Sequence, residues 1–484
     1  MYTIVNSDIM KKYDLIVIGS GAGLNLASPA FESGMEVAIV ENGPMGGTCL
    51  NRGCIPTKIL TYVADMIVQT QHSETLNLSA KVESVDFAAL MQRMRNHVGT
   101  DARNIGQAIN ATRGYDWYHT TGEFTGNYTM KVDDETIKGE HIFIAAGSRP
   151  LIPKIKGLDK VDFMTNKEAL ELTELPESMI ILGGGYIAAE FGHFFSAVGS
   201  DVTIIGRNPY LVKNEDHDVS ELLKRELSKR MKVLTNHEGV AVSESKGKKV
   251  VIARNRDTGA EKEFTADSLL IAAGRRSNAD LFKPEKTGVK TDDRGYVLVD
   301  EYFRTSKPRI WAFGDAIGRY LFRHVANEES QIVWYNWRRS LHGGSGHEQE
   351  LISMDYSAVP WAVFSYPPIA TVGMTLRQAK ASGKRLLVGR AEYTDVAKGF
   401  AMGNPEGFAR VIADAETRRI LGATIIGPYS PILIHEIISL MHTHDGAYMP
   451  ALRAMHIHPA MSEVVQRAIG RLAPIDGGHT HAHH

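Results

Sequence analysis

The run that decides the fold of this chain is Tyr13-Asp14-Leu15-Ile16-Val17-Ile18-Gly19-Ser20-Gly21-Ala22-Gly23. Its apolar residues are typical of a short buried strand, and its glycines predict a tight turn into a helix that reaches about Ser33. A second strand is expected over residues 36–40, and Glu41 stands at its end. Glycines let a backbone approach a diphosphate at a helix N-terminus, and an acid after the second strand accepts hydrogen bonds from a ribose hydroxyl. The segment therefore predicts a dinucleotide-binding βαβ unit.

A second unit of the same kind lies near the middle of the chain. Residues 179–182 are expected to form a strand and residues 201–205 the next one, with the turn Gly183-Gly184-Gly185-Tyr186-Ile187-Ala188 between them. One glycine turn before a helix is a weak signal, but Gly19 and Gly183 stand about 164 residues apart, each inside a full βαβ pattern. The two units predict an α/β protein that binds two dinucleotides, one held permanently and one exchanged.

Both cysteines of the chain lie in one short segment, Gly46-Gly47-Thr48-Cys49-Leu50-Asn51-Arg52-Gly53-Cys54-Ile55-Pro56-Thr57-Lys58. A structural disulfide between them would close so short a loop that it would constrain the unfolded chain little. A zinc site is an equally poor interpretation, because two thiols supply half of a closed tetrahedral site and no His lies nearby. We therefore interpret Cys49 and Cys54 as a redox-active pair.

Length and composition indicate an ordinary multidomain protein. A chain of 484 residues is too long for one core and predicts about three domains. The net charge of −2 does not favour a nucleic-acid partner, and without a long apolar run or a secretion signal no membrane partner is expected. The absence of further cysteines fits a cytoplasmic location. Beyond about residue 350, short strands mix with helices without glycine turns, which predicts an α+β domain.

Two further motifs are Ile310-Trp311-Ala312-Phe313-Gly314-Asp315 and His456-Ile457-His458-Pro459-Ala460-Met461-Ser462-Glu463. Together with the cysteine segment they resemble, in the same order, the motifs of the flavoprotein pyridine nucleotide-disulfide oxidoreductase family. The resemblance implies two Rossmann-like dinucleotide-binding domains and a C-terminal α+β dimerisation domain. The expected division is an FAD-binding domain over 1–148 and 271–350, an NAD(P)-binding domain over 149–270, a dimerisation domain over 351–475 and a His-rich tail over 476–484.

The resemblance also implies catalytic roles. Cys54 would be the thiolate beside the flavin, and Cys49 would attack the substrate. His458, with Glu463 to orient its imidazole, would protonate the leaving thiol and would come from the other subunit of a homodimer. A helix that begins at the cysteine segment is expected to lower the thiol pKa and to keep the attacking thiol charged.

Cofactor contacts are implied as well. Lys58 would lie beside the flavin ring and pair with Glu190, and Tyr186 would cover the empty nicotinamide pocket. The positions implied to contact FAD or the nicotinamide nucleotide are Gly19, Gly21, Gly23, Glu41, Thr48, Lys58, Gly122, Ala146, Gly147, Ser148, Asp315, His324, Gly183, Gly185, Tyr186, Ala188, Arg207, Lys213 and Gly274. In the first turn Leu24 replaces a glycine of the family pattern, and it is expected to keep helix and strand slightly apart.

The residues after the second unit indicate which nicotinamide nucleotide is used. Gly206 stands where an NAD-binding protein should carry an acid, and Arg207 and Lys213 match basic positions that meet a 2′-phosphate in NADPH-using relatives. NADP(H) is therefore preferred. NAD(H) remains possible, because Arg207 has the alternative interpretation of an exposed loop charge.

NADPH and a redox-active thiol pair predict reduction of a small disulfide, and the segments around His324 and His458 resemble mycothione reductases. The alternatives are an NAD-linked dihydrolipoamide dehydrogenase acting on a dithiol and, in a different class, a flavin quinone reductase or an NAD(P)H-sensing flavoprotein. A mercuric reductase is disfavoured, because it needs a further cysteine pair that this chain does not have. No metal site is expected, and the His-rich tail is interpreted as a disordered end.

Overall fold

The strand β1 (Lys11–Ile18) is the centre of the first sheet. The computed structural model describes residues 10–342 and 351–475, so the predicted His-rich tail lies outside the described residues. β1 pairs in parallel with β2 (Val37–Val40) and with β6 (Glu135–Ile144), and the order of the sheet is β3-β2-β1-β6-β5-β4. β16 (Ile310–Ala312) joins β6 in parallel from a distant part of the chain. The other strands of this sheet are β3 (Tyr115–Tyr118), β4 (Glu123–Gly126) and β5 (Thr129–Val132).

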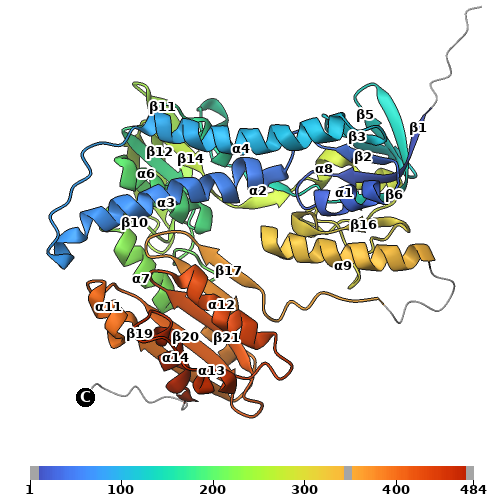
Figure 1. Ribbon diagram of the computed structural model, residues 1–484. Helices are drawn as coiled ribbons and strands as arrows, with labels where there is room; N and C mark the ends of the chain where they lie inside the picture. The colour runs from blue at the N-terminus through green and yellow to red at the C-terminus, as the bar shows by residue number, and fades with distance from the viewer. Residues whose placement is uncertain (1–9, 343–350, 476–484) are drawn as a thin grey trace, which may run out of the picture.

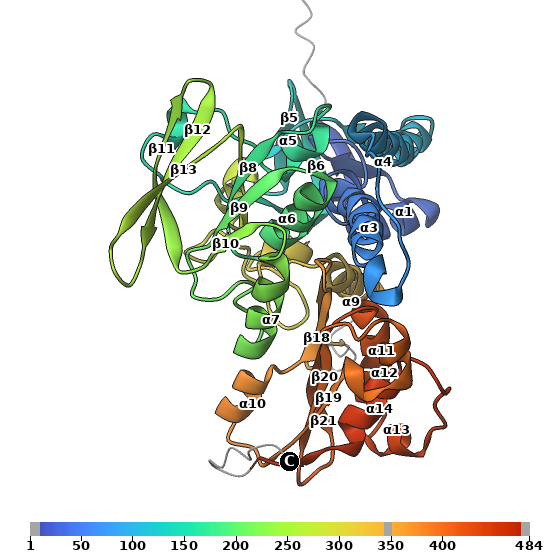
Figure 2. The same ribbon diagram turned by 90° about the vertical axis from the view of Figure 1, so that its left-hand side faces the viewer.

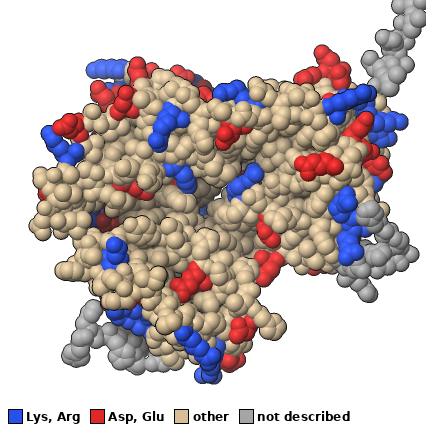
Figure 3. Space-filling view, in the orientation of Figure 1, with Lys and Arg blue, Asp and Glu red and all other residues tan. Residues whose placement is uncertain are grey.

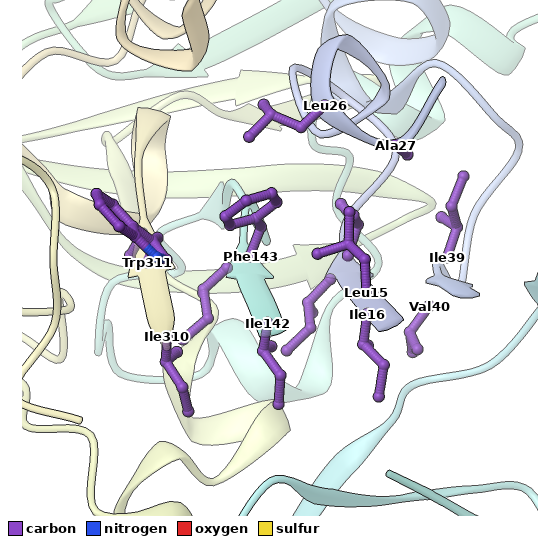
Figure 4. Packing of buried hydrophobic residues seen from close by; sticks show 14 of the residues in the cluster. Leu15, Ile16, Leu26, Ala27, Ile39, Val40, Ile142, Phe143, Ile310 and Trp311 are labelled. Carbon is purple, nitrogen blue, oxygen red and sulfur yellow. The ribbon is translucent and has the colours of Figure 1, made fainter. Parts of the chain in front are cut away.

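The first apolar core lies between this sheet and the helices α1 (Leu24–Glu32) and α9 (Arg323–His342). Figure 4 shows side chains of β1, β6 and β16 packed together, among them Leu15, Ile142 and Trp311. Burial of one such side chain contributes about 1.5–3 kcal/mol, which is why the parallel strands read as apolar runs. The Asn25 side chain of α1 donates to Ser330 Oγ of α9 at 2.9 Å. The first residues of α9 therefore lie near the helix that follows the first glycine turn.

The second sheet is parallel and has the order β10-β9-β8-β14. Its strands are β8 (Ser178–Leu182), β9 (Asp201–Ile205), β10 (Lys232–Leu234) and β14 (Ser268–Ile271). An antiparallel sheet of β11 (His237–Ser245), β12 (Lys248–Asn255) and β13 (Glu261–Ala266) stands beside it, as Figure 2 shows. The helix α6 (Tyr186–Val198) packs against α3 (Cys54–Gln71), which joins the second unit to the cysteine segment.

The C-terminal sheet has the order β17-β18-β21-β20-β19-β22 and is antiparallel throughout. Figure 1 shows it in orange and red below the first two sheets, with α12 (Ser430–Met441) and α14 (Glu463–Gly470) packed on it. Its strands are β17 (Pro360–Val363), β18 (Ile369–Gly373), β19 (Leu386–Glu392), β20 (Phe408–Asp414), β21 (Ile420–Ile426) and β22 (Ala473–Pro474). The predicted fold class, two Rossmann-like units and a C-terminal α+β domain, is confirmed.

The remaining α-helices and strands lie between and beside the elements of these sheets. They are α2 (Gly47–Arg52), α4 (Phe87–Asn110), α5 (Asn166–Glu171), α7 (His217–Leu227), α8 (Ala279–Phe282), α10 (Leu376–Ala381), α11 (Ala397–Ala401), α13 (Met449–Arg453), β7 (Ser148–Pro150) and β15 (Arg275–Ser277). Within the two described ranges, no helix combines the length and the apolar character that crossing a bilayer requires.

The first glycine turn differs from the expectation at one position. A Cβ atom at Gly23 would lie 2.2 Å from the carbonyl oxygen of Gly19 and 2.7 Å from a methyl group of Val17. Helix and strand therefore approach closely at Gly23, one residue before Leu24. The expected separation at Leu24 does not arise, because Gly23 supplies the small residue that close packing needs.

A buried carboxyl group joins the second unit to the C-terminal sheet. Glu215 precedes α7 and is 1% exposed. Its two oxygens accept hydrogen bonds from Trp361 Nε1 at 2.5 Å and from Thr371 Oγ1 at 2.8 Å. Burial raises the pKa of Glu215 to about 7, although both hydrogen bonds and the charge of Arg410 act in the opposite direction. Glu215 is thus neutral in the folded protein under mildly acidic conditions.

We expect Glu215→Gln to make thermal unfolding less sensitive to pH. From about pH 4.5 to about pH 7 the unfolded chain releases the Glu215 proton and the folded chain keeps it, so the parent loses stability as the pH rises. The amide does not titrate, and the advantage of the variant should grow to at most about 3 kcal/mol above pH 7. Tm values at pH 5 and pH 8 measure this effect. The exposed Glu221→Gln is the control, and a parallel shift of Glu215→Gln and the parent would contradict the expectation.

Candidate active site

The cysteine segment is packed against the first glycine turn. Gly46 and Gly47 have positive φ values of 96° and 66°, and α2 begins at Gly47. A Cβ atom at Gly47 would lie 2.6 Å from the Cα atom of Gly21, so only glycine allows this approach. Cys49 lies within α2 and Cys54 begins α3. Two motifs that are separate in the sequence therefore form one site.

The two thiols of this site differ in acidity. Both cysteines are free thiols, Cys54 more exposed than Cys49. The hydrogen bond from the Cys49 thiol lowers the pKa of Cys54 to about 7 against the effect of burial, and the charge of Lys58 acts in the same direction. The same hydrogen bond, together with burial, raises the pKa of Cys49. The expectation that a helix start keeps the attacking thiol charged is therefore wrong for Cys49, because the hydrogen bond with Cys54 and burial outweigh its place in the first turn of α2.

The structure brings Lys58 and Glu190 together. Lys58 Nζ of α3 lies 2.7 Å from Glu190 Oε2 of α6. The other oxygen of Glu190 accepts a hydrogen bond from the backbone of Phe364 at 3.0 Å, and the Lys58 ammonium lies 4.3 Å from the centre of the Phe364 ring. The Lys58 ammonium group is therefore held by Glu190 of the second dinucleotide-type unit and by Phe364 of the C-terminal domain.

The glycine turns fit bound dinucleotides. A Cβ atom at Gly19 would lie 2.3 Å from a backbone oxygen, and one at Gly183 would lie 2.1 Å from another, so both positions need glycine for the turn itself. At Gly185 a Cβ atom would meet nothing within 4 Å, and at Gly21 its nearest neighbour would be a side-chain nitrogen at 3.5 Å. Gly185 thus leaves an open approach at the start of α6, whereas Gly21 lies in contact with its neighbours at the start of α1. Helix starts of this kind are where a diphosphate binds.

Glu41 follows β2 as predicted and is held in the first turn. One of its oxygens accepts from the backbone and the hydroxyl of Ser20 at 2.9 and 2.8 Å, and the other accepts from the backbone of Gly43 at 2.8 Å. The carboxylate is only partly buried. It therefore lies at the end of the strand, where the sequence pattern predicts the contact with a ribose hydroxyl.

Asp315 lies in a polar cluster between the two parts of the first unit. The Ser148 hydroxyl donates to Asp315 Oδ2 at 2.5 Å, and Arg275 Nε donates to Ser148 Oγ at 2.6 Å. Burial raises the pKa of Asp315, although Arg275 and Ser148 oppose the shift. Arg275 was not singled out in the sequence. Its position in β15 is 127 residues from Ser148, a separation that gives no local signal.

The other predicted contact positions have mixed surroundings. A Cβ atom at Gly122 would lie 2.7 Å from a methyl group of Val40, so Gly122 serves packing in the first sheet. Gly147 and Gly274 have positive φ values of 67° and 124°, with open space where a Cβ atom would stand. His324 Nε2 donates to the carbonyl oxygen of Pro360 at 2.7 Å. The remaining positions are Thr48 within α2, Ala146 after β6 and Ala188, buried in α6.

Tyr186 opens α6 beside aromatic neighbours. Its ring centre lies 6.3 Å from that of Phe322, which in turn stacks on His324 at 5.5 Å. Burial raises the pKa of Tyr186 to about 12. An uncharged aromatic ring of this kind can cover a nicotinamide pocket, as the family pattern implies.

The loop after β9 carries exposed positive charge. A Cβ atom at Gly206 would lie 3.1 Å from the Cα atom of Gly184, so the loop packs on the second glycine turn. Arg207 and Lys213 are exposed, and within the described residues neither side chain has a hydrogen bond or an ion pair. Arg256 Nη1 donates to the carbonyl oxygen of Arg207 at 3.2 Å, which adds a second guanidinium to the loop.

His458 and Glu463 are in contact, but away from the thiols of their own chain. His458 Nδ1 lies 3.0 Å from Glu463 Oε1, and the His458 side chain is 69% exposed. The hydrogen bond from His458 lowers the pKa of Glu463. His456 has its own acid, Glu436 of α12, at 2.9 Å, a pairing across 20 residues that the sequence did not reveal. Within the described residues, no contact joins His458 to Cys49.

One face of the molecule is hollowed. Figure 3 shows a depression near the centre of one face, with Lys and Arg side chains at its rim. Such a rim favours the approach of anions, among them nicotinamide nucleotides.

Comparisons with known proteins agree with this geometry. The family model described as pyridine nucleotide-disulphide oxidoreductase matches residues 13–330, and that of the dimerisation domain of the same family matches residues 359–469. Mycothione reductase of Mycobacterium tuberculosis (strain ATCC 25618 / H37Rv) is 36% identical over 470 residues, which cover 95% of this chain and 99% of the relative. Dihydrolipoyl dehydrogenase of Chlamydia pneumoniae is 31% identical over 461 residues, covering 94% and 95%.

A solved structure has the same fold. The HOCl-induced flavoprotein disulfide reductase RclA from Escherichia coli superposes with a TM-score of 0.81 at 29% identity, covering 95% of this chain and 99% of that one. The family match, the relatives and the thiol pair beside the glycine turn lead to one conclusion. The chain belongs to the pyridine nucleotide-disulphide oxidoreductase family and is a flavoprotein disulfide oxidoreductase with a pyridine nucleotide as redox partner and a C-terminal dimerisation domain.

Proposed function

We propose that this protein is an NADPH-driven reductase of a low-molecular-weight disulfide, of the mycothione reductase type. The observation that carries the proposal is the pair of exposed, unpaired cations Arg207 and Lys213 after β9, in a loop where Gly206 occupies the place of a ribose-binding acid. The 36% identity to mycothione reductase over nearly the full chain supports this substrate class.

The proposed cofactor sites follow from the two glycine turns, each of which leads into a helix. FAD would be held by the first turn, Glu41 and Asp315, in a domain made of residues 1–148 and 271–350. The pairing of β16 with β6 supports this division of the sequence. The NADPH domain would comprise residues 149–270, with Gly183, Gly185 and Tyr186 at the nucleotide. When bound, FAD relays the electron pair of NADPH to the disulfide of Cys49 and Cys54.

We propose the following roles for the residues of the chain. The Cys49 thiolate attacks one sulfur of the substrate disulfide, forms a mixed disulfide and releases the first thiol. The partner subunit's His458 gives that leaving sulfur its proton, and Glu463 stabilises the imidazolium. Cys54 then attacks Cys49, releases the second thiol and restores the Cys49–Cys54 disulfide. Lys58, fixed by Glu190, lies where its positive charge stabilises the Cys54 thiolate.

A homodimer completes this site. The loop that carries His458 exposes Met455 fully and Ile457 to 78%, and Ile432 of α12 is 70% exposed. Apolar side chains of this size are rarely left together in water, and the dimerisation domain provides a second copy to cover them. We propose that this contact brings His458 of each subunit to the thiols of the other.

Steady-state turnover with both reduced nicotinamides tests the proposal. The substrates are mycothione disulfide, glutathione disulfide and lipoamide. We expect the highest kcat/KM with NADPH and mycothione disulfide. In the double variant Arg207→Ala/Lys213→Ala, kcat/KM for NADPH should fall about 100-fold, because each charge-assisted hydrogen bond to a 2′-phosphate contributes about 1.5–3 kcal/mol.

Turnover with NADH is the internal control, because it lacks the 2′-phosphate and should change little in the double variant. A strong preference of the parent for NADH and lipoamide would instead identify a dihydrolipoamide dehydrogenase. In that case Arg207 would be an ordinary exposed loop charge.

A further inference from the structure

The loop after β9 folds back onto the second glycine turn. Its first residue, Gly206, packs on Gly184, and near the other end of the loop the backbone N–H of Val212 donates to the carbonyl oxygen of Gly184 at 2.7 Å. Arg207 follows Gly206 in the chain, and Lys213 follows Val212. The two exposed cations of the loop therefore stand next to residues that contact the same glycine.

A third cation reaches this loop from the antiparallel sheet beside it. Arg256 follows β12, and its backbone N–H donates to the carbonyl oxygen of Asn236 at 2.9 Å. The backbone N–H of Asn236 in turn donates to the carbonyl oxygen of Asn208 at 2.7 Å. These bonds hold the turn between β12 and β13 at the carboxyl ends of β9 and β10, the edge of a parallel sheet where a dinucleotide binds. There Arg256 Nη1 donates to the carbonyl oxygen of Arg207 at 3.2 Å.

The positive charge of Arg256 has no acid to neutralise it in the part of the chain that the structure describes. A guanidinium has five N–H donors, and apart from the bond to Arg207 the Arg256 side chain forms no hydrogen bond and no ion pair there. Arg254, two residues earlier, is instead paired with Glu261 at 2.7 Å. Because neighbouring cations without an acid repel one another, this edge of the second unit is suited to an anion.

We propose that Arg256 is a further specificity-determining residue, which binds the 2′-phosphate of NADPH together with Arg207 and Lys213. The inference rests on the proposed preference for NADPH. A guanidinium can donate to a carbonyl oxygen and to a phosphate oxygen through different N–H groups, so the contact with Arg207 is compatible with a bond to the phosphate. NADH carries a hydroxyl at this position and offers no negative charge to Arg256.

The contact with Arg207 also has a purely structural interpretation, in which Arg256 only holds the backbone of the loop. A backbone role depends on a hydrogen-bond donor, whereas recognition of a phosphate depends on the positive charge. A backbone role would also affect NADH and NADPH alike, because both nucleotides bind at the same glycine turn. Variants that differ in charge and nucleotides that differ in the 2′-phosphate therefore separate the two roles.

The FAD-loaded enzyme is assayed by quinone reduction, which needs no disulfide substrate, with NADPH and with NADH. Arg256→Gln removes the charge and keeps an amide donor, whereas Arg256→Lys keeps the charge. For NADPH, kcat/KM should fall about 10-fold in Arg256→Gln and at most about threefold in Arg256→Lys, because the charge-assisted bond is lost only in the first. For NADH it should change less than about twofold in both, since an exposed charge without an ionic partner contributes little.

The matched control is Arg254→Gln, which removes one positive charge two residues away and should leave kcat/KM for both nucleotides unchanged. Inhibition by 2′-AMP gives a second readout, because this fragment carries the phosphate and no nicotinamide. Its inhibition constant should rise about 10-fold in Arg256→Gln, and that of 5′-AMP should stay the same.

Unchanged kcat/KM for NADPH in Arg256→Gln overturns the proposal. An equal loss with NADPH and NADH also overturns it, because Arg256 then has the backbone role, and so does an equal loss in Arg254→Gln. If Arg207→Ala/Lys213→Ala loses activity with NADPH and Arg256→Gln does not, the proposed function stands and only the role of Arg256 fails. A parent enzyme that prefers NADH and binds 2′-AMP no better than 5′-AMP contradicts the proposed function, and the role of Arg256 falls with it.

Discussion

Cys49→Ser is expected to abolish disulfide reduction while the protein continues to reduce a quinone with NADPH. A serine hydroxyl is not ionised near neutral pH and cannot form a mixed disulfide, so kcat with the disulfide should fall at least about 10³-fold, which corresponds to about 4 kcal/mol of activation free energy. Quinones accept electrons from the flavin directly and do not need the thiols. The two activities, measured on the same preparation, give the ratio that tests the role of Cys49.

Cys54→Ser is the matched control for this experiment. It leaves Cys49 able to attack but removes the thiol that resolves the mixed disulfide. Multiple turnover should therefore stop, and about one substrate half per subunit should remain attached to Cys49, as mass spectrometry can detect. Disulfide turnover that persists in Cys49→Ser would contradict the mechanism and favour the quinone reductase or NAD(P)H-sensing alternatives.

Much of the fold could be predicted from local patterns. The apolar runs before the two glycine turns became β1 and β8, because a strand covered on both faces must be apolar along its whole length. The sequence also predicts short C-terminal strands over residues 361–364, 407–412 and 420–426, within two residues of the bounds of β17, β20 and β21. The close approach of α1 and β1 at Gly23 could not be predicted. The sequence shows that Leu24 replaces a glycine, but it does not show that Gly23 already makes the close contact.

The candidate site was predictable only where a motif is contiguous or the family pattern pairs its residues. Lys58 and Glu190 are 132 residues apart, and the family resemblance paired them. Arg275 and Arg323 lie in no motif, and their positions beside Asp315 and Gly21 depend on how distant strands and helices pack. The acidity of the thiols was misjudged for the same reason, because it depends on the hydrogen bond between them and on where α3 begins.

His458→Ala is expected to lower disulfide turnover by about 10²- to 10⁴-fold, the usual contribution of a general acid. Quinone reduction should again survive, which separates loss of the proton donor from loss of the cofactor. The Glu463→Gln variant should have a smaller effect, since it removes the charge that stabilises the imidazolium but keeps an acceptor for the His458 Nδ1 proton.

Mixed dimers decide whether His458 serves its own subunit or the other one. Cys49→Ser and His458→Ala subunits, each inactive alone, are combined in equal amounts and allowed to exchange. In a mixed dimer one site lacks both groups, and the other joins an intact Cys49 to the intact His458 of its partner. Half of the dimers are mixed and each has one working site, so about a quarter of the parent activity should return. If His458 acted within its own chain, every site would lack one group and no activity would return, although the His458–Glu463 contact would be unchanged.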